Sequence, residues 1–118
     1  MIERFTQINQ ELTDIRITNK MTMSVAIHIH GMTSRLHPGL TWVMKERARD
    51  FNGIYYSYGC ELDGKLGRVN FDVFGGSAPR SNNKFEVRDQ GIYLIKEDTN
   101  ESLQVAQWRP HDPGCFIL

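Results

Sequence analysis

The chain has 118 residues, of which 40% are hydrophobic and 24% are charged, an ordinary globular composition that argues against disorder. This length fits one domain, residues 1–118, that buries its own core. Acidic and basic side chains balance at 14 each, which argues against nucleic acid as partner because nucleic-acid binders usually carry a basic excess.

The N-terminus and the cysteines indicate where the protein is located. Residues 1–10 include charged side chains from the third position onward and lack the apolar region of a signal peptide. We see no run of the ~18 apolar residues that a transmembrane helix needs. Two cysteines are too few for a disulfide framework, so we expect a reduced, cytoplasmic protein.

Two segments have buried-type residues at helical spacing. From residue 2 to residue 15 such residues recur every three or four positions, which predicts an amphipathic helix. A second helix is predicted from Pro38, which suits a first helical turn, to the stop at Asn52 and Gly53. The predicted buried stripe of this second helix comprises Leu40, Val43, Met44, Arg47 and Phe51.

Strand patterns fill the rest of the chain. Residues 21–30 alternate strictly between apolar and polar, which predicts a strand. Residues 54–74 centre on Asp63 and Gly64, a favoured pair for a two-residue hairpin turn, which would place Tyr58 opposite Val69. The same register places Cys60 on the core face as a small buried hydrophobe.

The C-terminal third predicts a loop and three further strands. Residues 75–84 are rich in turn-forming residues, strands are expected at 85–88, 92–97 and 103–108, and the tail from 109 to 118 is expected to be irregular. The sequence therefore predicts an α+β fold. It has one antiparallel or mixed sheet of about five to six strands, a C-terminal β-meander and two helices packed on one face.

Three of the four histidines lie between residues 28 and 37. His28 and His30 share one face of the predicted strand and can bind one metal ion, with His37, or His111 and Asp112, completing the set. The same side chains can act as general acid or base, so a small zinc- or other transition-metal-dependent or histidine-based hydrolase is one hypothesis. The polar face of a strand explains the pattern equally simply, and we favour that interpretation, with no cofactor and no catalytic residue.

The solvent face of the predicted hairpin suggests a different function. It carries Tyr55, Arg68, Asn70 and Asp72, and tyrosine and arginine are enriched at protein-binding hot spots. We therefore favour a small soluble protein-binding module, such as an inhibitor, an immunity-type protein or a phage- or plasmid-encoded antagonist. Homodimerisation fits the same surface. A regulatory domain whose sheet binds a small molecule is the remaining hypothesis.

Overall fold

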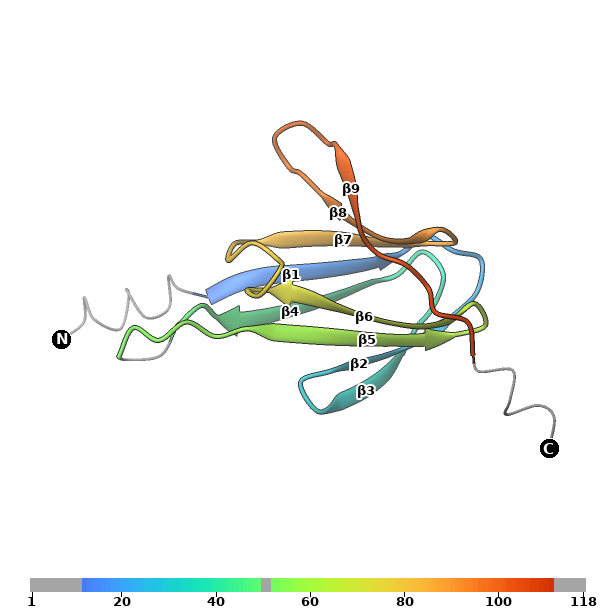
Figure 1. Ribbon diagram of the computed structural model, residues 1–118, viewed down its shortest axis with the longest axis horizontal. Coiled ribbons are helices and arrows are strands. Elements are labelled where there is room, and N and C mark those ends of the chain that lie inside the picture. Colours follow the sequence, from blue (N-terminus) through green and yellow to red (C-terminus); the bar gives the residue numbers. More distant parts are fainter. Residues whose placement is uncertain (1–11, 50–51, 112–118) are drawn as a thin grey trace.

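The computed structural model describes residues 12–49 and 52–111, and its strands form two sheets that enclose one hydrophobic core (Figure 1). Both sheets supply buried side chains to that core, among them Ile17, Phe85, Ile27 and Leu62. The five-stranded sheet contains, in spatial order, β4 (Thr41–Arg47), β1 (Leu12–Asn19), β7 (Asn83–Arg88), β8 (Gly91–Ile95) and β9 (Ser102–Ala106).

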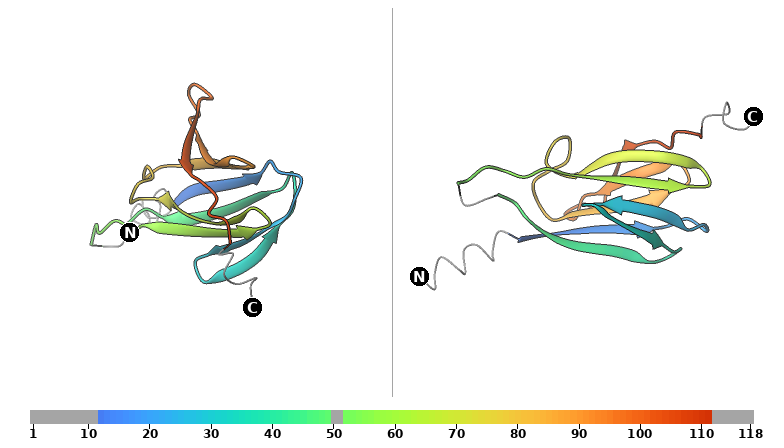
Figure 2. Two further views of the ribbon diagram at one scale, coloured as in Figure 1. Left: turned by 45° about the vertical axis from the view of Figure 1, so that its right-hand side comes forward. Right: turned by 90° about the horizontal axis from the view of Figure 1, so that it is seen from below.

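The second sheet has four strands, and all its neighbours are antiparallel. In the larger sheet, β1 and β7 form a parallel pair and the remaining pairs are antiparallel. Figure 2 shows the two sheets from two further directions. The second sheet contains, in spatial order, β3 (Met32–Leu36), β2 (Val25–Ile29), β5 (Tyr58–Gly64) and β6 (Gly67–Phe74).

The α+β prediction is wrong, because the described part of the chain is all-β and contains no helix, hence none that could cross a membrane. The segment 41–47, predicted as helix, is β4 and pairs along its whole length with β1. Of the predicted stripe, Met44 is buried, whereas Leu40 and Val43 are 55% and 45% exposed. The segment begins with β-branched and aromatic residues, which favour extended backbone once a neighbouring strand is present.

The other predicted helix, residues 2–15, is contradicted where it can be observed, since β1 begins at Leu12; residues 2–11 lie outside the described residues. Burial in β1 falls on Ile15, Ile17 and Asn19, which is the period of two of a strand. Leu12 and Ile15 are three positions apart, and this short spacing resembled helical periodicity.

The predicted strand at residues 21–30 is confirmed in its central part, as β2, with Val25, Ile27 and Ile29 buried. It ends earlier than expected, because His30 and Gly31 form the turn to β3. Their φ values of 55° and 73° are those of a type I′ turn. The segment between the predicted strand and the predicted helix therefore contains a further strand, β3.

The predicted hairpin exists, but its register is different. Lys65 and Leu66 form the turn, Tyr58 lies opposite Phe74, and Val69 lies opposite Leu62. From Gly59 onward the pairing is displaced by four residues from the predicted register, an even number, so the core face is preserved; a bulge between Tyr58 and Gly59 adds one more residue at Tyr58. Cys60 is therefore buried, as predicted, with 4% of its surface exposed.

Gly64 is required for packing rather than for the turn. A Cβ atom at Gly64 would lie 2.9 Å from Val25 Cγ1 of the neighbouring strand.

The three strands expected in the C-terminal third are confirmed as β7, β8 and β9, and the expected loop is confirmed over residues 75–82.

Candidate functional site

The outer edges of the two sheets, β6 and β9, meet at one point beyond the end of β9. The Arg68 amide donates to the Arg109 carbonyl oxygen at 2.9 Å, and the Arg109 amide donates back to the Arg68 carbonyl oxygen at 2.8 Å. Gly67, at φ 129°, permits this approach, because a Cβ atom there would collide with the Arg109 carbonyl. Away from this junction, the hairpin of β8 and β9 rises away from β6 (Figures 1 and 2).

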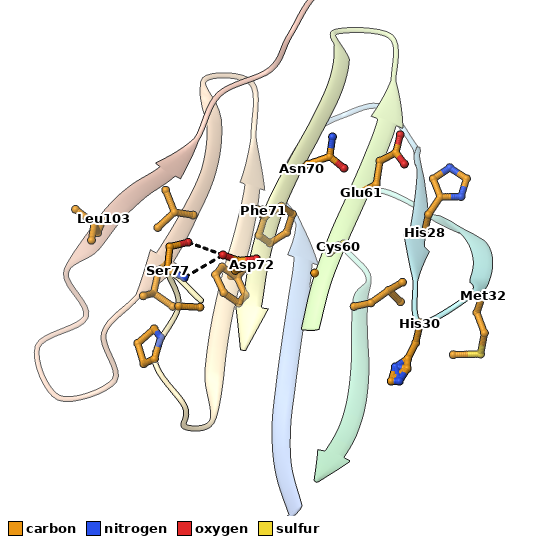
Figure 3. Close-up of a pocket in the computed structure, with 18 of the residues that line it drawn as sticks. His28, His30, Met32, Cys60, Glu61, Asn70, Phe71, Asp72, Ser77 and Leu103 are labelled. Atoms are coloured by element: carbon orange, nitrogen blue, oxygen red, sulfur yellow. Dashed lines mark hydrogen bonds between the residues drawn. The ribbon is translucent and has the colours of Figure 1, made fainter. Parts of the chain in front are cut away.

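A cleft of about 770 Å³ lies between this hairpin and the four-stranded sheet (Figure 3). We call it the β6–β9 cleft. Part of its lining is the edge-to-face pair of Phe71 and Phe85, whose ring centroids are 5.2 Å apart. Leu103 of β9 and Met32 of β3, on opposite sides of the cleft, are each 53% exposed, and Val105 is 40% exposed. The cleft therefore combines a buried apolar lining with exposed apolar side chains.

The loop at residues 75–82 forms one wall of the cleft. The Asp72 carboxylate accepts hydrogen bonds from the Ser77 amide and hydroxyl, both at 2.9 Å (Figure 3). Gly76, at φ 61°, passes so close to Asp72 that a Cβ atom there would lie 2.5 Å from the carboxylate. Asp72 thus holds the loop against the end of β6.

Asn83 holds the other end of this loop. Asn83 is buried, with only 4% of its surface exposed to solvent. The amide nitrogen donates to the carbonyl oxygens of Val73 at 2.9 Å and Pro79 at 2.7 Å, and its oxygen accepts from the Ser81 hydroxyl at 3.1 Å. The cleft wall is therefore tied to both sheets.

Backbone groups of both edge strands point away from their own sheets. Alternate residues of a strand direct their N–H and C=O groups to the same side. Arg68 directs its groups to Arg109, away from β5, so Asn70 and Asp72, two and four residues later, also direct theirs away from β5. The carbonyl oxygen of Glu101, the residue before β9, is directed toward the β8 side, because it accepts from the Lys96 amide at 2.8 Å. Ser102 therefore faces the opposite way, toward the open edge. Among the described residues, no strand pairs with either edge beyond the Arg68–Arg109 junction.

The predicted binding residues are divided by the structure. Asn70 and Asp72 line the β6–β9 cleft. The Arg68 guanidinium forms ion pairs with Glu61 at 2.9 Å and Asp63 at 3.3 Å. Tyr55 precedes β5 rather than lying in the hairpin, and the Arg80 guanidinium lies 5.1 Å from its ring centroid.

The histidines are also separated. His37 Nδ1 lies 3.0 Å from the Ser24 hydroxyl, at the start of β2, whereas His30 follows the end of that strand. Six extended residues span ~20 Å, so His37 does not converge with His30. His28 lines the cleft and lies 2.9 Å from the Thr33 hydroxyl. Across residues 12–49 and 52–111, no three histidine, cysteine or acidic side chains are placed to hold a metal ion.

His111, the other candidate ligand, lies near the turn of the β5–β6 hairpin. Its Nε2 atom is 3.0 Å from the Gly64 carbonyl oxygen and 3.6 Å from Asp63. Asp112 lies outside the described residues. Zinc binding by the histidines, the alternative to the favoured interpretation without a cofactor, stays a hypothesis.

Cys60 also lines the cleft, but its environment opposes reactivity. Burial, with a smaller contribution from the Glu61 charge, raises the pKa of the Cys60 thiol to about 12. A thiol that reacts as a nucleophile must ionise near neutral pH. Cys60 is thus part of the apolar lining.

A second cluster was missed by the sequence analysis. His30 Nδ1 lies 3.7 Å from Glu46 Oε1, and the ring centroids of His30 and Tyr58 are 4.8 Å apart. These three residues come from the β2–β3 turn, β4 and β5. Their meeting depends on β4 being a strand, which the local sequence pattern concealed.

Comparison with protein-family models, with curated proteins and with solved structures gave no match for this chain. The function is therefore inferred from the geometry of the site.

Proposed function

We propose that the protein is a protein-binding module that holds an extended segment of its partner in the β6–β9 cleft. The observation that carries the proposal is a pair of open strand edges beside the cleft, at its lining residues Asn70 and Asp72 on β6 and at Ser102 on β9, which precedes the lining residue Leu103. An extended peptide binds such an edge by adding a strand, whose backbone hydrogen bonds supply affinity. Alternate peptide side chains then enter the neighbouring cleft.

The exposed apolar side chains support the same mode of binding. Leu103 and Val105 lie on the edge strand itself, and their surfaces stay open to solvent. Covering the exposed half of one such side chain contributes on the order of 1 kcal/mol. Inhibitors, immunity-type proteins and phage- or plasmid-encoded antagonists act through direct contacts of this kind, and the proposal includes these classes. We also propose a cytoplasmic location, which suits the free thiol of Cys60.

The test blocks the open edge of β9. Peptides selected from a random library for binding to the protein would be titrated against Ser102→Pro and the matched control Ser102→Ala. Proline removes an N–H that faces away from β8, so the existing ladder is retained while strand addition is lost. We expect roughly tenfold weaker binding to Ser102→Pro, equivalent to ~1.4 kcal/mol, and unchanged binding to Ser102→Ala.

Equal affinity of both variants would contradict strand addition at β9. So would amide protection by the bound peptide at β3, the other open edge of the four-stranded sheet.

A small-molecule site is the second candidate, because a cleft of about 770 Å³ falls within the usual range of ligand pockets. A ligand of this kind contacts the lining rather than the strand edge. It would raise the melting temperature of wild-type and Ser102→Pro protein alike, which distinguishes it from an added strand.

A further inference from the structure

A second hollow, of about 530 Å³, lies where the β2–β3 turn, β4 and the beginning of β5 meet. It shares only His30 with the β6–β9 cleft among the residues that the structure describes. Its lining contains the aromatic rings of His30, Tyr56 and Tyr58 together with the carboxylate of Glu46. Rings and a carboxylate on one hollow are the groups that attract organic cations.

The rings are held in place by their neighbours. Tyr58 is central, with centroid distances of 4.8 Å to His30, 6.0 Å to Tyr56 and 5.9 Å to Phe74, which is fully buried. The Tyr58 hydroxyl donates to the Arg47 carbonyl oxygen at 3.2 Å. The ring surfaces are therefore largely ordered before any ligand arrives, which reduces the entropy cost of binding.

Glu46 is the acidic residue in the lining of this hollow, which also includes the basic residues Lys45 and Arg47. Its side chain is 22% exposed, and Glu46 Oε1 lies 3.7 Å from His30 Nδ1, a contact that becomes an ion pair when the imidazole is protonated. The pKa of Tyr58 is raised, first by burial and next by the negative charge of Glu46, while Arg47 lowers it least of all the contributors. Lys45, on the rim, lies 4.0 Å from Asp14. At the Tyr58 hydroxyl the effect of the negative charge of Glu46 therefore exceeds the opposing effect of Arg47.

We propose that His30, Glu46, Tyr56 and Tyr58 form a binding site for an alkylated ammonium group. Such a cation is weakly hydrated, so ring faces and one carboxylate can replace its water. Leu12, which is 42% exposed, supplies an apolar wall for the alkyl substituents. The group can come from a methylated lysine side chain or from a free quaternary amine. This site does not depend on the proposed binding of a peptide in the β6–β9 cleft.

The test is a titration of the full chain with choline and with dimethylbutanol, its neutral isostere, followed by NMR of the tyrosine rings. Choline is expected to shift the Tyr56 and Tyr58 resonances, and dimethylbutanol to bind roughly tenfold more weakly because it lacks the charge. Glu46→Gln should weaken choline binding by roughly tenfold and Tyr56→Leu by about fivefold. Glu97→Gln, which changes an exposed carboxylate outside the hollow, should bind as wild type does.

Equal binding of choline and dimethylbutanol would overturn the proposal, as would wild-type affinity in a folded Glu46→Gln variant. Absence of any choline-dependent shift at Tyr56 and Tyr58 would also overturn it. A parallel titration with acetylated trimethyllysine amide separates the two sources. Tighter binding than choline indicates a protein side chain, and weaker binding indicates a free amine.

Discussion

Arg68 and Arg109 exchange two backbone hydrogen bonds, of 2.9 and 2.8 Å, across 41 positions of the chain (109 − 68), and this exchange joins the edge of one sheet to the segment that follows the other. The junction holds β6 next to the segment that follows β9, two residues along β6 from the cleft residue Asn70. Its formation depends on Gly67, where any side chain would meet the Arg109 carbonyl.

We predict that Gly67→Ala opens this junction. The collision with the Arg109 carbonyl and the positive φ together should lower the free energy of unfolding by more than about 2 kcal/mol. Amide hydrogen exchange at Arg68 and Arg109 should accelerate, while exchange in the central strand β7 changes only in proportion to global stability.

Gly39→Ala is the matched control for Gly67→Ala. Gly39 has φ 80°, and a Cβ atom there meets nothing within 4 Å, so it tests backbone strain without collision. This variant should lose about 1 kcal/mol. If both variants lost the same stability and left Arg109 exchange unchanged, the junction would not be closed by Gly67.

Asn83 gives a second prediction, concerning the loop wall of the cleft. Asn83→Ala removes the donor for a buried acceptor, the Val73 carbonyl oxygen, and for a partly buried one, the Pro79 carbonyl oxygen. We expect a loss of about 3 kcal/mol in the free energy of unfolding, measured by urea denaturation. Asn70→Ala changes an exposed residue of β6, and its free energy of unfolding should stay within about 0.5 kcal/mol of the wild-type value.

A small loss in Asn83→Ala, similar to that in Asn70→Ala, would mean that the loop satisfies these carbonyl groups without the side chain. Proteolytic sensitivity of the loop provides an independent measurement. It should rise in Asn83→Ala and stay at the wild-type level in Asn70→Ala.

The sequence predicted local features well where one face of a strand packs on the core. Alternation identified β2, and the apolar pattern placed Cys60 in the core even though the hairpin register was wrong. The register could not be predicted, because Gly64 serves contact with Val25 rather than the turn. The short apolar stretch that forms β4 fitted a helix equally well. Only its pairing with β1 determines that it is a strand.

The site was harder to predict than the strands. Asn70 and Asp72 were recognised as surface residues from the alternation in β6, and they line the cleft. The opposite wall comes from β9, which no local pattern brings near β6. In the same way, Glu46 meets His30 only because β4 and the β2–β3 turn belong to different sheets that pack together.

The buried thiol of Cys60 gives a prediction for alkaline pH. The ordinary pKa of 9.0 is raised to about 12 in the folded protein, so the folded state favours the protonated thiol. This contribution is complete below pH 9 and is lost as pH rises from 9 toward 12, by roughly 4 kcal/mol at the upper limit. Tyr58, whose pKa is raised above 10.0, acts in the same direction from pH 10 upward.

The measurement compares the free energy of unfolding of wild type and Cys60→Ala from pH 7 to pH 11. Cys60→Ala loses buried contacts at every pH but carries no thiol to ionise, so its curve should fall less steeply above pH 9. The stability difference between the two proteins should therefore shrink with pH, while Tyr58 and Cys115, present in both, cancel in the comparison. Parallel curves would show that the Cys60 thiol ionises in the folded protein as readily as in the unfolded chain, and would contradict its burial in the apolar lining of the cleft.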